Sequence, residues 1–481
     1  MNESAIDQAY TVLSRAVREA ALTVLAMAGA AACAWWLDPA PGAIVLGAVL
    51  ALSLARSHLA AQARGWLEAL AMLPVVGLAC MGVGQLLHEW PWLGAIVFVA
   101  VVASSTWVRR FGPLAQRLGR LALLPFVTLL VVPPLPRATW PLPHAFALVA
   151  PLLIALTSLA CVLLAQWLGR RLGWLGAHAS HEPETTSSAA TSTLRPSPPV
   201  RLALQMAVAL AAAFVVGYLV FPAHWRWLVL TALLVNVGNR GRLDVVNKSV
   251  LRVLGASAGT VLALAVGDHA HAGGGLVAAL AIACVFAGLV LRPLGYGWWA
   301  LCVTLALALL QSVQPGGEPL LLGQRLVEIV VGAIIGLAAA WFVLPIRSSD
   351  VLRRRIAGAL AAMSEALDPQ AGERRSRDVV LAVSQVAQLR PAFRAHGLMP
   401  RRWKLPQAGD WIAALAACEA PIVALVERGE TPGAVRKAIG VARKAMREPA
   451  QIGPALATLR DVLSSLPAAT VAVQAAASHD A

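Results

Sequence analysis

A stretch near the middle of the chain, NKSVLRVLGASAGTVLALAV (247–266), contains a pattern known from hydrolases. Gly255, Ser257 and Gly259 fit G-x-S-x-G, in which a serine on a sharp turn between a strand and a helix acts as a nucleophile. Here the serine lies inside an apolar run that is too long for a strand, and Arg252 comes just before it. The α/β context that the chemistry requires is missing, so we predict no catalytic role for Ser257.

The glycines of this stretch have a structural interpretation instead. Gly255 and Gly259 form a GxxxG face, which lets the backbones of two membrane helices approach closely. Gly332 and Gly336 repeat the spacing in the last apolar run before residue 345. We expect both pairs to be sites of helix packing.

Other enzyme signatures are absent from the sequence. It contains no G-x4-G-K-[ST] phosphate loop, no H-E-x-x-H zinc motif, and no C-x-x-C pair among its cysteines. His269 and His271 come close to a ligand pair, but they lie in a Gly-rich loop without carboxylates at ligand spacing. The sequence therefore predicts no enzyme, no metal site and no cofactor.

Composition indicates a membrane protein. Of the 481 residues, 59% are hydrophobic and only 13% are charged, about half of the roughly 25% that is usual in soluble domains. In a bilayer, residues that face lipid and residues that face the core are both apolar. The net charge of +15 could suggest nucleic acid. However, the charges gather at the ends of apolar runs and in the C-terminal part, so membrane orientation explains them better. We predict an all-α polytopic membrane protein that lies in a lipid bilayer and binds no nucleic acid.

The sequence predicts about twelve transmembrane helices in two halves. A cytoplasmic amphipathic segment, 1–18, precedes a first six-helix membrane half at 19–175. Residues 176–200 are rich in Ser, Thr, Ala and Pro, which is typical of a disordered cytoplasmic linker. A second six-helix half follows at 201–345, and 346–481 should form a cytoplasmic helical domain. The apolar segments lie at approximately 19–37, 41–55, 67–87, 91–107, 118–132, 144–169, 201–221, 225–239, 249–267, 273–291, 296–313 and 322–345.

The two halves repeat each other at an offset of 183 residues, at which Arg, Pro and Gly residues at segment boundaries coincide. Internal duplication is a common way to build transporters. Because each half has an even number of segments, we expect two parallel repeats related by a pseudo-two-fold axis along the membrane normal. The coinciding pairs are Arg18 with Arg201, Pro39 with Pro222, Gly84 with Gly267, Arg109 with Arg292, and Gly112 with Gly295.

Charge bias predicts the orientation of the segments. The alternate loops contain only Arg137 and Arg226, whereas the loops after segments 2, 4, 6, 8 and 10 contain thirteen Lys and Arg residues. The cationic loops and both termini should therefore be cytoplasmic. The thirteen are Arg56, Arg64, Arg109, Arg110, Arg117, Arg120, Arg170, Arg171, Arg240, Arg242, Lys248, Arg252 and Arg292.

The second half resembles a known family in three motifs. These are HWRWLVLTALLV (224–235), NKSVLRVLGASAG (247–259) and QRLVEIVVGAIIGLAAAWFVLP (324–345). They resemble the fusaric-acid-resistance (FUSC) family of integral membrane bound transporters, which includes aromatic acid exporters of the bacterial inner membrane. In the first half, Met72 and Val76 stand where the second half has its GxxxG pair. The residues that carry the resemblance are Asn247, Arg252, Gly255, Gly259, Arg325, Gly332, Gly336 and Pro345.

This resemblance implies a multi-pass inner-membrane secondary transporter for the efflux of aromatic or related organic acids, including toxic weak acids, driven by protons. It also implies a small organic anion as substrate, with a periplasmic adaptor (membrane-fusion) protein and an outer-membrane channel as partners. Homo-oligomerisation is left open. Two alternatives remain: an organic-anion channel like the plant malate channels, which resemble this family in their six-span unit, and a non-transporting membrane scaffold.

Two short apolar segments indicate where a substrate could bind. Segments 41–55 and 225–239 have fifteen residues each, about 22 Å of helix against a hydrocarbon core of roughly 30 Å. Short segments at matching places in the two halves are typical of transport sites, although local thinning of the bilayer is the alternative. In the second of them, Thr231 and Asn236 are polar, and Trp225 lies at the outer end, where an aromatic belt would also explain it.

Charges within apolar segments provide the other candidates, since each costs about 2.5–3.5 kcal/mol on insertion scales. Glu328 lies one turn into the last span, three residues after Arg325, so the two share a helix face. Our hypothesis is that Arg325 attracts an anionic substrate and Glu328 exchanges the driving proton, with a structural ion pair as the alternative. Arg240 and Arg252 should edge the cytoplasmic mouth, either recruiting carboxylates or setting orientation.

The charge bias predicts the location of both chain ends. Reporter tags fused to residue 1 and to residue 481 should both be protected from a membrane-impermeant reagent in intact cells and accessible in inverted vesicles. Tags that report opposite compartments would contradict the even number of spans.

Overall fold

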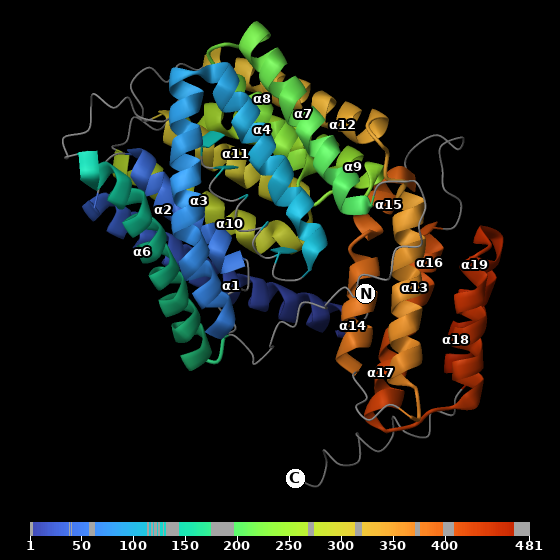
Figure 1. Cartoon of the computed structure of the whole chain (residues 1–481). Helices are drawn as coiled ribbons and strands as arrows, with labels where there is room; N and C mark the ends of the chain where they lie inside the picture. The colour runs from blue at the N-terminus through green and yellow to red at the C-terminus, as the bar shows by residue number, and fades with distance from the viewer. Residues whose placement is uncertain are drawn as a thin grey trace. The chain divides into compact units, whose positions relative to one another are not determined.

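The computed structural model is helical wherever it has regular secondary structure among the residues it describes (Figure 1). This confirms the predicted all-α class. The described residues are 3–37, 39, 41–56, 63–112, 115–116, 119, 123, 126–127, 129–130, 144–174, 197–267, 274–312, 320–370, 376–397 and 408–465. The fifth predicted segment, most of the predicted linker, and His269 with His271 lie wholly or largely outside them.

The chain divides into two compact units. The first comprises 1–239 and 248–345, and the second comprises 240–247 and 346–481. The first unit therefore contains both halves of the repeat. The short piece 240–247 belongs to the second unit although it lies between two helices of the first.

The helices of the first unit follow the predicted apolar segments. Proline is well suited to the first turn of a helix, and helix α7 begins at Pro198, inside the C-terminal end of the predicted linker. Helix α1 begins at Glu3, so the predicted amphipathic segment is continuous with the first span. The helices are α1 (Glu3–Leu37), α2 (Pro41–Arg56), α3 (Ala63–Glu89), α4 (Pro91–Trp107), α6 (His144–Arg171), α7 (Pro198–Val220), α8 (Trp225–Asn236), α9 (Arg242–Gly267), α10 (Gly274–Leu291), α11 (Tyr296–Ser312) and α12 (Leu320–Phe342).

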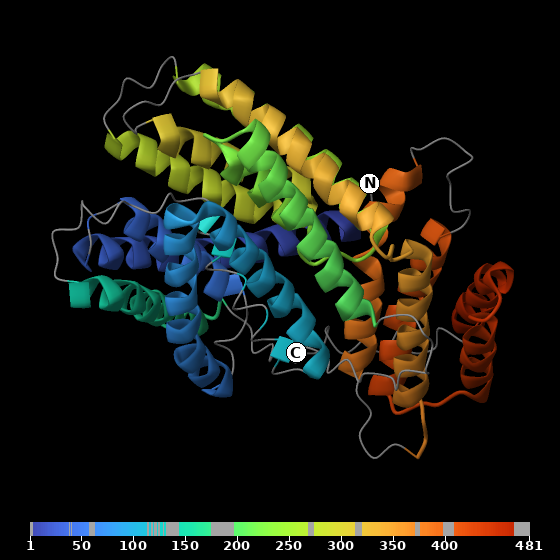
Figure 2. The ribbon, with the colours of Figure 1, turned by 45° about the horizontal axis from the view of Figure 1, so that its top comes forward.

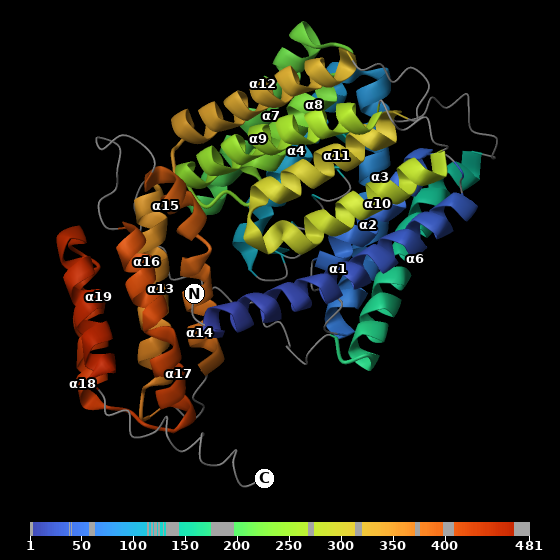
Figure 3. The ribbon, with the colours of Figure 1, turned by 180° about the vertical axis from the view of Figure 1, so that it is seen from behind.

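The packing of these helices reproduces the repeat. Helices α1, α2 and α6 contact one another in the first half, and α7, α8 and α12 do so in the second (Figure 2). Between the halves, α4 packs on α7, and its counterpart α10 packs on α1 (Figure 3). The fourth helix of each half thus packs on the first helix of the other half. A pseudo-two-fold relation between the halves requires this reciprocal packing.

Six helical stretches among the described residues are long and apolar enough to span a membrane. Shorter apolar helices, α8 among them, lie between these candidates along the chain. The protein is a multi-pass membrane protein, and the total of twelve spans stays a prediction. The six stretches are Leu13–Leu37, Pro91–Phe111, Leu152–Arg171, Pro198–Val220, Gly323–Phe342 and Ala408–Glu427.

The last of these stretches belongs to the second unit and is not one straight helix. It consists of α16 (Ala408–Ala417) and α17 (Glu419–Glu427), which meet at Cys418. Residues of both helices join the hydrophobic core of that unit. The other helices there are α13 (Ser348–Ala366), α14 (Ser376–Ala387), α15 (Arg390–Gly397), α18 (Gly433–Ala445) and α19 (Pro449–Ser464).

The second unit also includes the start of α9. Leu243 is part of its hydrophobic core, and the backbone N–H of Leu243 donates to Ser348 Oγ at 3.1 Å. The Arg240 side chain donates to the carbonyl of Gln388 at 3.3 Å. Burial and the nearby charge of Arg240 lower the pKa of the Arg355 guanidinium, which Asp244 partly counteracts. Helix α9 therefore starts as a component of the C-terminal helical unit.

Small residues let the helices of the second half approach closely. A Cβ added at Gly332 would lie 2.5 Å from the carbonyl oxygen of Leu228, so α12 contacts the backbone of α8 directly. A Cβ at Gly255 would lie 2.7 Å from the carbonyl oxygen of Gly297, which places α9 equally close to α11. Gly336 and Gly259 make the corresponding approaches one turn later on each helix.

Replacing Gly332 by alanine should destabilise the protein by about 2 kcal/mol, because the new methyl group would overlap a backbone atom. Gly323→Ala on the same helix is the matched control, since a Cβ there meets nothing within 4 Å. Thermal unfolding of the purified protein in detergent would measure both variants. Equal melting temperatures would contradict direct contact between α8 and α12.

Candidate functional site

Three charged side chains are almost completely buried in the second membrane half. Arg252 on α9 is 2% exposed, and Arg325 and Glu328 on α12 are 3% and 1% exposed. Removing a charge from water costs several kcal/mol unless other groups compensate for it. Because a buried charge is costly, charged residues inside a membrane unit are candidates for a functional role.

The first turn of α8 supplies the partners of the two charges on α12. His224 Nδ1 lies 3.8 Å from Glu328 Oε1. The guanidinium carbon of Arg325 lies 3.7 Å from the ring centroid of Trp227, which is a cation–π contact. His224 and Trp227 are three residues apart, as are Arg325 and Glu328, so one face of each helix carries both members of its pair.

The cluster has an excess of positive charge. Arg325 is close enough to both Arg252 and Glu328 for electrostatic interaction. Glu328 Oε2 and Arg252 Nε are buried, and neither has a hydrogen-bond partner among the described residues. Two buried guanidinium groups and one buried carboxylate therefore lie in the same part of the second membrane half. We call Arg252, Arg325, Glu328, His224 and Trp227 the charged cluster.

The polar residues of α8 lie where this helix packs on α12. Asn236 Nδ2 donates to the carbonyls of Ala232 at 3.0 Å and of Gly336 at 3.3 Å. Thr231 is completely buried, with its Cβ next to Gly332. Asn236 also borders a cavity of about 40 Å³, which Arg109 of the first half lines as well. Thr231 thus belongs to the packing surface, and Asn236 belongs both to it and to this small cavity.

Two candidates are placed outside the membrane unit. Arg240 and Asn247 are the first and last residues of the piece 240–247, which belongs to the second unit. Arg240 donates to Gln388 there, and Asn247 is partly exposed. Arg252 is buried and interacts electrostatically with Arg325, and its place at the cytoplasmic mouth stays a prediction.

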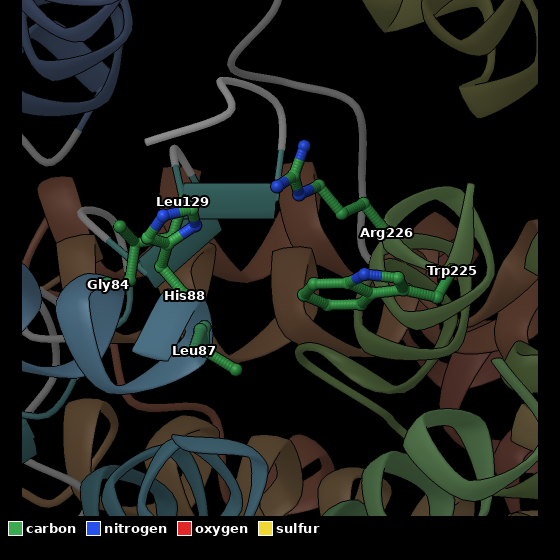
Figure 4. Close-up of a pocket in the computed structure, with 6 residues that line it drawn as sticks. All are labelled: Gly84, Leu87, His88, Leu129, Trp225 and Arg226. Atoms are coloured by element: carbon green, nitrogen blue, oxygen red, sulfur yellow. The ribbon is translucent and has the colours of Figure 1, made fainter. Parts of the chain in front are cut away.

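Trp225 does not join the charged cluster. It lines a second, larger cavity of about 180 Å³ between α3 and α8, together with Arg226 and His88 (Figure 4). The sequence motifs did not mark His88 or Arg226 as site residues, and they did not mark His224 as the partner of Glu328. His88 does match His271 at the repeat offset of 183, which could have drawn attention to it. His224 is identified as a site residue only by the packing of α8 against α12, which brings it next to Glu328.

The comparisons with known proteins cover the region that contains the charged cluster. Residues 189–339 match the family described as "Fusaric acid resistance protein-like". This chain carries a fusaric acid resistance protein-like region. The resemblance inferred from the sequence motifs is thereby confirmed for these residues. All five residues of the charged cluster lie within it.

A curated relative of unassigned role shares part of the chain. "Uncharacterized protein YhfK" of Escherichia coli (strain K12) is 29% identical over 183 residues, which is 36% of this chain and 25% of that protein. The chain thus spans about a quarter of the length of this relative. No solved structure matches the chain.

The charged cluster predicts non-additive effects on stability. Glu328→Gln alone should cost about 3 kcal/mol, because it leaves two buried guanidinium groups without their carboxylate. The double variant Arg325→Gln with Glu328→Gln should cost less than the sum of the single variants, because it also removes one buried cation. Thermal unfolding of the four proteins in the same detergent measures this coupling. Strict additivity would show that Arg325 and Glu328 do not interact.

Proposed function

We propose that this protein is a secondary transporter of the bacterial inner membrane that exports small organic anions, aromatic or related weak acids among them, using the proton gradient. The similarity of residues 189–339 to fusaric acid resistance proteins supports a role in transport across a membrane. The observation that carries the proposal is the buried cluster of two arginines and one glutamate in this region. The positive charge of two buried arginines would attract an anionic substrate.

The cluster suits proton coupling because Glu328 can change the charge balance by one unit. When the carboxylate is ionised, it places a negative charge beside the Arg325 guanidinium, and when it is protonated, that negative charge is lost. Occupancy of the arginines by an anion and protonation of Glu328 are therefore thermodynamically linked, in whichever order they occur. His224, 3.8 Å from Glu328 and one-third exposed, offers a route for the proton between Glu328 and water.

The partners and orientation form part of the same proposal. A periplasmic adaptor protein and an outer-membrane channel would carry the exported anion beyond the inner membrane. Both termini and the helical unit 346–481 would lie in the cytoplasm. A bilayer surrounds the apolar helices of the first unit in any orientation.

Glu328→Gln should uncouple transport from the pH gradient, because glutamine has nearly the shape of a protonated glutamate but exchanges no proton. The assay measures uptake of radiolabelled benzoate by proteoliposomes with an imposed pH gradient and a clamped membrane potential. Protein-free liposomes correct for passive leak. We expect wild-type uptake to respond to the gradient, and the response of the variant to fall by about tenfold, as for loss of one positioned proton-transfer group.

Glu365→Gln, on the exposed face of α13, is the matched control and should behave as wild type. A Glu328→Gln protein that elutes as a single species and retains full dependence on the pH gradient would remove Glu328 from the mechanism. Single-channel currents from the wild-type protein in a planar bilayer would favour the channel alternative.

A further inference from the structure

The cavity of about 180 Å³ lies where the two membrane halves meet. Its lining comes from α3 with Gly84, Leu87 and His88, from Leu129 of the first half, and from Trp225 and Arg226 of α8. Figure 4 shows the His88 imidazole and the Arg226 guanidinium on opposite sides of the cavity, with the Trp225 indole below Arg226. By the predicted orientation, these ends of α3 and α8 face the outside.

Arg226 supplies the positive charge of this cavity. Arg226 Nε is buried and has no hydrogen-bond partner among the described residues. The Arg226 guanidinium carbon lies 5.4 Å from the Trp225 ring centroid. This cation–π contact stabilises the guanidinium but does not neutralise its charge. A partly buried guanidinium with an unsatisfied nitrogen is costly, and an anion that pairs with Arg226 in the cavity would reduce this cost.

A cluster of aromatic rings forms the wall next to Trp225. The Trp225 ring centroid lies 5.4 Å from Phe214 and 5.1 Å from Tyr218, and Phe214 in turn contacts Phe98. These rings interlock α4, α7 and α8, which leaves the indole little freedom to move. A rigid indole beside a cation provides a stacking surface for a flat ring that carries a negative charge.

The repeat lacks this arrangement at the equivalent place. At the offset of 183 residues, Trp225 and Arg226 correspond to Gly42 and Ala43. Phe98 and Phe214 correspond to Ala281 and Ala31. Small residues therefore stand at these four positions of the repeat, whereas Tyr218 corresponds to another aromatic residue, Trp35. Packing alone does not explain the difference, because the alanine version also packs.

The first turn of α8 connects this cavity to the charged cluster. Its residues 225 and 226 line the cavity, and His224 and Trp227 contact Glu328 and Arg325. A movement of this turn would alter both sites at once. The cavity is smaller than the roughly 300–1,000 Å³ that is usual for drug-sized ligands, so the ligand must be small.

We propose that this cavity is a binding site for a small planar organic anion. Arg226 pairs with the carboxylate or sulfonate group, His88 donates a second hydrogen bond from the opposite side, and the ring stacks on Trp225. The identification of this anion as the transported substrate rests on the proposed function. The binding itself does not.

Equilibrium dialysis of radiolabelled benzoate against the purified full-length protein in nanodiscs tests the site without any gradient. Removing the guanidinium with Arg226→Gln should weaken binding about tenfold, as expected for one charge-assisted hydrogen bond. Arg226→Lys, which keeps the charge, should recover part of this loss. Gly84→Val should abolish binding by filling the cavity, at low cost to the fold, because the new Cβ meets only the end of the flexible Leu129 side chain.

Arg110→Gln is the matched control, because Arg110 also stacks on a tryptophan, Trp107 at 4.5 Å, but lies outside the cavity. It should bind benzoate as the wild type does. Competition with cyclohexanecarboxylate, which is not planar, and with chloride tests the ring requirement, and both should displace benzoate poorly. Equal displacement by chloride would show an unspecific anion site and overturn the proposal, as would unchanged binding by a correctly folded Arg226→Gln protein.

The two proposals fail in different ways. A wild-type protein that binds benzoate in this cavity but does not transport it would refute the proposed function alone. A protein that transports benzoate equally well after Arg226→Gln and Gly84→Val would refute the cavity as a substrate site and leave proton-coupled export intact.

Discussion

The cost of holding charge in an apolar environment governs the second membrane half. Arg252, Arg325 and Glu328 lie among residues that are otherwise nearly all apolar, at exposures of 1–3%. The charges of Arg325 and Glu328 are tolerated there because they attract each other, and because an imidazole lies beside Glu328 and an indole beside Arg325. This proximity in turn depends on glycine. A Cβ at Gly332 would overlap the backbone of α8, and one at Gly336 would overlap the Asn236 side chain, so both glycines allow α12 to pack closely on α8.

The duplicated membrane halves form two equivalent contacts with each other, and one of these contacts can acquire side chains that the other lacks. Both halves place a first, second and sixth helix together, and each offers its fourth helix to the other half. The contact between α4 and α7 contains interlocked rings, and residues of both helices line the cavity of about 40 Å³ that Arg109 and Asn236 also border. At the repeat offset, Phe98 and Phe214 correspond to alanines, whereas Tyr218 corresponds to Trp35. The two contacts thus repeat in their helices but differ in their side chains.

Helix α9 contributes to both compact units. Its first residues belong to the C-terminal unit, where Leu243 enters the hydrophobic core and Ser348 accepts the Leu243 N–H. Farther along the same helix, Arg252 belongs to the charged cluster and Gly255 packs against α11.

The sequence alone determined the fold class, the membrane environment, the repeat and the resemblance that residues 189–339 bear out, because these depend on composition and on local spacing along one chain. It also singled out Arg325, Glu328 and Arg252, since an isolated charge in an apolar run is visible without a structure. Only the tertiary structure decided that His224 and Trp227 are their neighbours, that Arg240 belongs to the C-terminal unit, and that His88 and Arg226 share a cavity. The physical reason is that these contacts join helices far apart in the chain, and their geometry depends on which helix faces pack together rather than on any local pattern of residues.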